Sequence, residues 1–126
     1  MKHILVVDDD LTTLDICADY LGHAGHKVTT ASTTSQAYEC LEKERVDLLV
    51  LDVYIPGEGG LDFLQRVRDR WHDLPTILIT GYPGVNTLVS ALRLNVCEYL
   101  PKPFRPRDLL AAIEKNLAGD DGDIST

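Results

Sequence analysis

Short apolar runs alternate strictly with stretches of helical periodicity along this chain, and that alternation restricts the fold more than any other feature. The runs at His3 to Val7 and Asp47 to Leu51 are continuous, which is typical of strands buried on both faces. The run from Lys27 to Ala31 is polar and suits a sheet edge. In order, the runs that suit strands cover residues 3–7, 27–31, 47–51, 76–79 and 97–100.

Apolar residues also recur three and four positions apart, which places them on one face of a helix. Ser32-Thr33 suits the cap of one helix and Pro106 the first turn of another, while Gly22 and Gly25 suit a helix end. The residues expected on these helical faces are Leu14, Cys17, Ala18, Leu21, Ala37, Cys40, Leu41, Leu64, Val67, Trp71, Val85, Leu88, Val89, Leu92, Leu109, Leu110, Ile113 and Leu117.

Five strands and five helices in alternation predict an α/β fold, a doubly wound parallel sheet with helices on both faces and right-handed crossovers. We expect the strand order 2-1-3-4-5, with the first and third strands adjacent in the centre. At 126 residues the chain suits one domain, assigned to residues 1–118. Residues 119–126 carry no core pattern and are predicted to form a flexible acidic tail or the start of a linker.

Composition excludes several classes of function. No apolar run is long enough to span a membrane. The 12 basic and 20 acidic residues give a net charge of −8, which argues against binding nucleic acid. The apolar stretch at the N-terminus is too short for a signal peptide, so we expect a cytoplasmic protein. Cys17, Cys40 and Cys97 lack a metal-binding spacing and are predicted to be buried reduced thiols.

Chemically capable side chains follow the expected strands at their carboxyl ends, where open α/β sheets bind ligands. These are the triplet Asp8 to Asp10, Asp52, Thr80 and Lys102. Each has an ordinary alternative: the triplet suits a helix cap, and a lone lysine between prolines is usually solvated. Because all of these residues follow strands at the carboxyl edge of the expected sheet, a functional site is favoured over these separate roles. Clustered carboxylates repel one another, and a hard cation such as Mg²⁺ relieves that repulsion.

This set of groups is the one needed to form an aspartyl phosphate. A carboxylate beside Mg²⁺ can attack phosphorus in line, while the metal and an ammonium group offset the charge on the phosphoryl oxygens. A hydroxyl group can then donate a hydrogen bond to the new phosphate.

Four segments carry a resemblance to the receiver domains of bacterial two-component response regulators, from Lys2 to about Leu117. The segments are L-V-V-D-D-D (5–10), D-L-L-V-L-D-V-Y-I-P-G (47–57), I-L-I-T-G (77–81) and Y-L-P-K-P-F (99–104). The resemblance implies the flavodoxin-like (βα)5 fold and a phosphoacceptor, Asp52. The metal, Mg²⁺ or Mn²⁺, would be held by Asp9, Asp52, the backbone carbonyl of Tyr54 and, through a water, Asp8.

The resemblance also implies the remaining roles. Lys102 would pair with the phosphoryl group, Thr80 would be the switch hydroxyl, and Tyr99 the aromatic that moves with it. The Lys102-Pro103 peptide bond would be cis. Bulky rings at Tyr54 and Tyr82, two positions beyond Asp52 and Thr80, suggest a slowly decaying phosphate.

By the same resemblance, a sensor histidine kinase or a phosphotransfer protein would donate the phosphoryl group. The chain would not be an enzyme in the usual sense, because it would catalyse only its own phosphorylation and dephosphorylation. The added charge would change the surface formed by the fourth helix, the fifth strand and the fifth helix. The output would be a changed affinity for a partner, an attached domain or a second copy of the chain.

Three other functions are considered. A pseudo-receiver would use the same fold as a constitutive interaction module, but the intact acidic group, Thr80 and Lys102 argue against it. A small phosphatase would need an acid two residues beyond Asp52, where Tyr54 stands. A flavin carrier would need a phosphate-binding loop after the first strand, where the aspartates would repel a phosphate lacking a metal.

Overall fold

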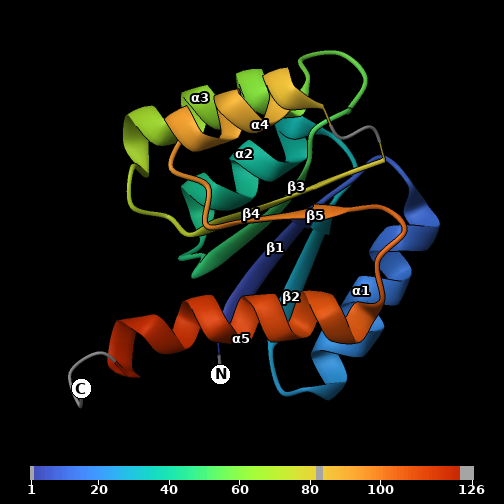
Figure 1. Ribbon diagram of the computed structural model, residues 1–126. Helices are drawn as coiled ribbons and strands as arrows, with labels where there is room; N and C mark the ends of the chain where they lie inside the picture. Colours follow the sequence, from blue (N-terminus) through green and yellow to red (C-terminus); the bar gives the residue numbers. More distant parts are fainter. Residues whose placement is uncertain (1, 82–83, 123–126) are drawn as a thin grey trace.

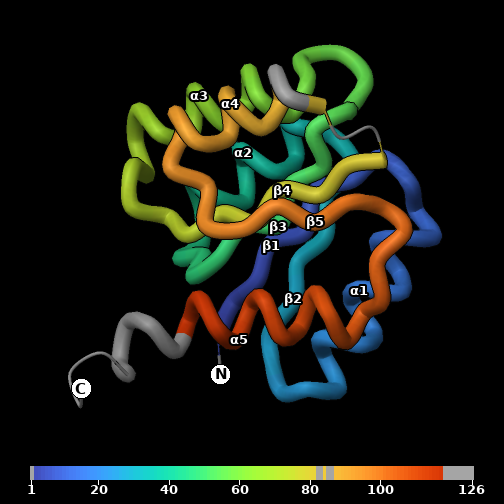
Figure 2. Tube along the Cα trace, viewed as in Figure 1, coloured from blue at the N-terminus to red at the C-terminus, as the bar shows by residue number. Residues whose placement is uncertain are grey.

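The computed structural model describes residues 2–81 and 84–122, in which strands and helices alternate as the sequence predicts. Figure 1 shows a central sheet covered on both faces, and the trace in Figure 2 follows the chain as it crosses that sheet. In order, the elements are β1 (His3–Val7), α1 (Leu11–His23), β2 (Lys27–Ala31), α2 (Thr34–Lys43), β3 (Leu48–Asp52), α3 (Gly60–Arg70), β4 (Thr76–Thr80), α4 (Val85–Arg93), β5 (Glu98–Pro101) and α5 (Pro106–Gly122).

The strands are all parallel and lie in the order β2-β1-β3-β4-β5, which confirms the predicted topology. The register pairs Val7 of β1 with Leu51 of β3, so the residues that follow these two strands emerge side by side. On the other flank of β3, Asp52 pairs with Ile79 of β4. The central strands therefore place the ends of β1, β3 and β4 along one short stretch of the sheet edge.

Two apolar cores, one on each face, hold the helices to the sheet. Leu5 and Val7 point into the core beneath α2, α3 and α4, and Ile4 and Val6 point into the core beneath α1 and α5. All four are fully buried, as expected of a strand covered on both faces. Figures 1 and 2 show the same division, with α1 and α5 on the face opposite the other helices.

Most of the expected inward residues are buried, which confirms the helical faces of α1, α2, α3 and α5. Ala18, Trp71 and Leu110 are only partly buried. Phe63, a fully buried residue of α3, is absent from the predicted face although it lies four positions before Val67 and fits the same spacing. Thr33 caps α2, as predicted, by accepting a hydrogen bond from the backbone N–H of Gln36 at 3.1 Å.

The apolar stripe of α4 departs from the prediction. Leu88, Val89 and Leu92 are 46%, 43% and 68% exposed, so they do not face the core, while Ala91 is 3% exposed and does. Spacing alone shows that apolar residues share a helical face but not which way the face points. The side chain of Val85 lies outside the described part of the chain.

Two smaller differences concern Cys97 and the end of the chain. Cys97 is exposed, so the expectation of buried thiols holds only for Cys17 and Cys40; the residue precedes β5 instead of lying in it. The helix α5 continues to Gly122, and residues 123–126 lie outside the described part. The division at residue 118 stays a prediction. Within the described residues, no helix combines the length and apolar character needed to cross a membrane.

Candidate phosphoryl-acceptor and metal site

The acidic residues converge at the carboxyl edge of the sheet, because β1 and β3 are neighbours. Asp8 directly follows β1, and Asp52 is the last residue of β3. One carboxylate oxygen each from Asp8, Asp9 and Asp52 lies within 4.8 Å of the others. Asp8 is 0% and Asp52 4% exposed, while Asp9 is exposed. Two buried acids and one solvent-facing acid therefore surround a single small space.

Lys102 reaches this space from the segment that follows β5. Its Nζ donates to Oδ2 of Asp8 at 2.7 Å and to Oδ2 of Asp52 at 3.0 Å. The Lys102-Pro103 peptide bond is cis. A single ammonium group thus bridges the two buried carboxylates.

Backbone amides fix the second oxygen of each buried acid. The N–H of Asp10 donates to Oδ1 of Asp8 at 2.9 Å, and the N–H of Tyr54 donates to Oδ1 of Asp52 at 3.0 Å. Both bonds come from the residue two positions further on, a turn that aspartate readily forms. The carboxylates are consequently held in defined orientations by the turns that end their strands.

The pKa values of Asp8 and Lys102 reflect two opposing effects, burial and the charge of the neighbouring groups. Desolvation raises the pKa of Asp8 although the hydrogen bond from Lys102 lowers it. Burial disfavours the charge on Lys102, but its hydrogen bonds to Asp8 and Asp52 outweigh that effect and raise its pKa. Lys102 therefore stays charged beside the two buried acids, Asp8 and Asp52.

Asp10 takes the alternative role considered for the acidic triplet. Its side chain accepts from the backbone N–H of Thr12 at 3.1 Å and from Oγ1 of Thr13 at 2.9 Å, which caps α1. The cap hydrogen bonds lower the pKa of Asp10, with the Thr13 hydroxyl contributing most. The triplet is thus divided, with Asp10 serving the helix and Asp8 and Asp9 facing the acidic space.

The turn after Asp52 depends on a close approach of two backbone segments. A Cβ added to Gly60 would lie 2.2 Å from the backbone oxygen of Asp52 and 2.8 Å from Cα of Val53. The N–H of Gly60 also donates to the carbonyl of Val53 at 2.8 Å. This contact joins the start of α3 to the end of β3, so α3 helps to position Asp52.

Thr80 and Tyr99 lie on the two strands that follow β3 in the sheet. Thr80 ends β4 and is fully buried. Tyr99 of β5 pairs with Leu78 and packs against the core beneath α2, α3 and α4. Its buried hydroxyl has no hydrogen-bond partner among the described residues. Tyr82 lies outside the described residues.

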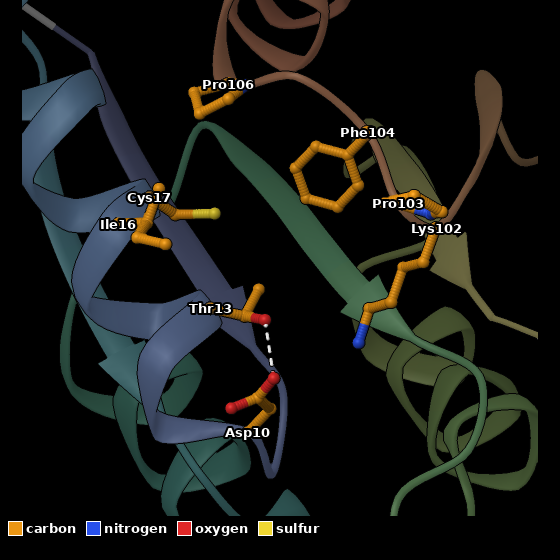
Figure 3. Close-up of a pocket in the computed structure, with 8 residues that line it drawn as sticks. All are labelled: Asp10, Thr13, Ile16, Cys17, Lys102, Pro103, Phe104 and Pro106. Atoms are coloured by element: carbon orange, nitrogen blue, oxygen red, sulfur yellow. Dashed lines mark hydrogen bonds between the residues drawn. The ribbon is translucent and has the colours of Figure 1, made fainter.

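Two neighbouring cavities share Lys102. One, of about 450 Å³, is lined by Asp9, Asp52, Tyr54, Gly81 and Lys102, and it gives access to the acids. The other, of about 440 Å³, lies between α1 and the segment leading into α5. Figure 3 shows its lining residues, with Sγ of Cys17 directed from α1 toward the ring of Phe104.

The thiol of Cys17 gives the second cavity little reactivity. Cys17 is 1% exposed, and burial raises the pKa of its thiol to about 11. The nucleophilic thiolate is therefore scarce near neutral pH. The chemistry of this edge belongs to the acidic cavity.

The donor set of the acidic cavity fits a hard divalent cation. Carboxylate oxygens from three residues converge there, and Tyr54, whose backbone carbonyl is a further candidate ligand, lines the same cavity. Oxygen donors at such a site suit Mg²⁺ or Mn²⁺, whereas zinc is usually held by histidine and cysteine. The residues could hold such an ion beside Asp52.

Comparisons with known proteins agree with this geometry. The family model of the response regulator receiver domain matches residues 4–114. Regulatory protein VanR of Enterococcus faecium is 35% identical over 114 residues, which cover 90% of this chain and 49% of VanR. The chain spans about half the length of the curated relatives it matches, including response regulator SaeR of Staphylococcus aureus, of which 51% is covered.

Solved structures are similar over nearly the whole chain. A CheY-like receiver domain protein from Methanospirillum hungatei JF-1 has a TM-score of 0.93 and 30% identity, with 98% of each chain covered. A response regulator protein from Burkholderia pseudomallei, solved with a phosphorylated aspartic acid, a calcium ion and citrate, has a TM-score of 0.84 and 25% identity, with 98% of this chain and 72% of that chain covered.

Proposed function

Because this chain belongs to the response regulator receiver domain family of two-component signalling, we propose that it accepts a phosphoryl group on Asp52 and acts as a switch. The observation that carries the proposal is the convergence of Asp8, Asp9 and Asp52 around one space bridged by Lys102. Receiver domains are signalling switches and not classical enzymes. The proposed catalysis extends only to the chain's own phosphorylation and dephosphorylation.

In the proposed reaction, a carboxylate oxygen of Asp52 attacks the phosphorus of a phosphohistidine in line. The new O–P bond forms as the N–P bond breaks, and the departing imidazole nitrogen takes up a proton. Lys102 shifts from the free carboxylates to the phosphoryl oxygens, where its charge offsets the negative charge that they carry. The Thr80 hydroxyl donates a hydrogen bond to the phosphorylated product, and Tyr99 moves with it.

The metal ligands proposed are Asp9, Asp52 and the Tyr54 carbonyl, with Asp8 acting through a water. A bound Mg²⁺ or Mn²⁺ supplies positive charge beside the transferred phosphoryl group. The Burkholderia pseudomallei neighbour supports the assignment, because its structure combines a phosphorylated aspartic acid with a divalent ion on the same fold. Asp8 and Lys102 would hold Asp52 in place before the metal and the donor arrive.

The proposed phosphoryl donor is a sensor histidine kinase or a phosphotransfer protein in the cytoplasm. The proposed output surface comprises α4, β5 and α5. The exposed side chains of Leu88, Val89 and Leu92 support this choice, because an apolar stripe in water favours contact with a partner, an attached domain or a second copy.

Phosphorylation with a small donor tests the proposal directly. We expect the wild-type chain to gain one phosphoryl group from acetyl phosphate in the presence of Mg²⁺, as measured by intact-protein mass spectrometry. Asp52→Asn should not gain it. Asp19→Asn, which changes an aspartate with an 80% exposed side chain on α1, should behave as the wild type.

Two outcomes would contradict the switch. One is a wild-type chain that shows no Mg²⁺-dependent modification and no spectral change with beryllofluoride, which would favour the pseudo-receiver. The other is a modification that persists in Asp52→Asn, which would place the phosphoryl group elsewhere.

A further inference from the structure

Arg68 is a half-buried cation whose guanidinium group is surrounded by backbone carbonyls. Its Nε donates to the carbonyl of Leu94 at 2.8 Å, and one terminal nitrogen donates to the carbonyls of Leu74 at 2.8 Å and Trp71 at 3.2 Å. The other terminal nitrogen donates to Oγ1 of Thr76 at 3.1 Å. The same nitrogen also donates to the carbonyl of Asn95 at 3.5 Å, so five acceptors surround the five N–H donors of Arg68, whose pKa is lowered by desolvation.

These acceptors belong to three separate elements. Trp71 caps the carboxyl end of α3, Leu94 caps the carboxyl end of α4, and Thr76 begins β4. The carboxyl end of a helix carries partial negative charge, so one guanidinium group at two such ends is electrostatically favoured. Figure 1 shows α3 and α4 side by side on the same face of the sheet, as this bridge requires.

Along the rest of α4, the described side chains contribute little to the core. Gly84, its N-cap residue, offers no side-chain hydrogen bond to the helix. Among the side chains of residues 87–93, only that of Ala91 is buried. Two partly buried residues just beyond the carboxyl end, Leu94 and Val96, pack against the core. Among the described residues, the attachments of α4 to the rest of the fold therefore gather at its carboxyl end.

The amino end of α4 is the end that the chain connects to the candidate site. Gly84 follows the fully buried Thr80 by four positions in the sequence. A displacement of Thr80 toward a phosphoryl group would thus pull on the amino end of α4, while the carboxyl end is held by Arg68.

We propose that Arg68 is a positioning residue that makes the carboxyl end of α4 a fixed pivot, so that the phosphorylation signal moves the amino-terminal turns of α4 and leaves its last turn in place. This inference rests on the proposed function, because it requires a signal at Asp52. It extends the proposed function by naming Arg68 as the residue that determines which part of α4 moves.

Hydrogen exchange of the full chain, measured by mass spectrometry with and without Mg²⁺ and beryllofluoride, tests the pivot. In the wild type, amide exchange in the first turns of α4 should change by about fivefold or more, while exchange at residues 92–96 stays constant. In Arg68→Met the change should extend to residues 92–96. Beryllofluoride binding at Asp52, followed by fluorine NMR, should be unchanged.

Arg70→Met is the matched control, because it makes the same substitution two residues along α3. Arg70 contacts Glu42 and Tyr38 of α2 on the outer surface, and among the described residues none of its hydrogen bonds reaches α4. It should reproduce the wild-type pattern. Arg68→Lys keeps the charge but loses the forked geometry, so its exchange pattern should fall between those of the wild type and Arg68→Met.

Equal exchange changes at both ends of α4 in the wild type would overturn the pivot, and this result does not depend on the folding of any variant. A wild-type pattern in Arg68→Met would overturn it as well. By contrast, a wild-type chain with no fluorine signal from bound beryllofluoride would refute the proposed function itself, and the pivot with it.

Discussion

Asp8 and Asp10 lie in the same acidic triplet, yet their surroundings give them different roles. Asp10 caps α1 at the surface, whereas Asp8 is fully buried beside Lys102. The sequence predicted that strand ends would bring the acids and Lys102 together. It left open which aspartate would cap the helix, because that depends on where α1 begins relative to the sheet edge.

Asp8 should make stability depend on pH. Burial raises its pKa above the ordinary value of 3.8, so its ionised form is less favourable in the folded chain than in the unfolded one. The folded state begins to lose stability as the pH rises past the ordinary pKa of Asp8, and the loss is complete above the raised pKa. Without Mg²⁺, Asp8→Asn should therefore increase the free energy of unfolding at neutral pH by about 1 kcal/mol.

Urea unfolding at a series of pH values measures this effect. The difference in the free energy of unfolding between Asp8→Asn and the wild type should vanish as the pH falls below the ordinary value, because Asp8 is then protonated in both the folded and the unfolded states. Asp19→Asn, on the solvent-facing surface of α1, should show no such trend. A variant that is less stable than the wild type at neutral pH would contradict the explanation.

At the scale of an element, α3 shows how a single glycine links a helix to the site. The sequence does not show that residue 60 must be glycine, because this requirement arises from contact with the backbone of Asp52 and Val53. In α4, by contrast, the predicted spacing of apolar residues is present, but the packing of Ala91 against the core decides which way that apolar face points.

Gly60→Ala should destabilise the fold by about 3 kcal/mol, because the added methyl group would meet rigid backbone atoms. Gly22→Ala is the matched control. Gly22 lies within α1, and an added Cβ would have no atom within 4 Å. The free energy of unfolding of this variant should therefore exceed that of the wild type by about 0.5–1 kcal/mol. Chemical unfolding monitored by the fluorescence of Trp71 measures both. Equal effects of the two substitutions would contradict the close-contact explanation.

For the fold as a whole, strict alternation was enough to predict the layers, the parallel sheet and the edge where the candidate site residues gather. The register of β1, β3 and β4 then brings the side chains together. The bridging role of Arg68 could not be predicted in this way, because it joins elements whose contacts depend on helix packing and not on strand order.

Metal binding should stabilise the entire fold. An ion bound only by the folded chain adds about 2.7 kcal/mol to the free energy of unfolding at a concentration one hundred times Kd. Thermal unfolding in a Mg²⁺ titration should show a rising Tm for the wild type and for Asp19→Asn, and little rise for Asp9→Asn or Asp52→Asn. An equal rise in all four proteins would indicate binding outside the acidic cavity.

The contrast in exposure among the three cysteines has a practical consequence. Cys17 and Cys40 are buried, and desolvation raises the pKa of both thiols, whereas Cys97 faces solvent just before β5. A maleimide dye added near neutral pH should therefore attach selectively at Cys97 without any engineered substitution. The backbone N–H of Cys97 donates to the carbonyl of Thr76, the first residue of β4, at 2.8 Å, so the dye would lie at the edge of the sheet opposite the acidic cavity.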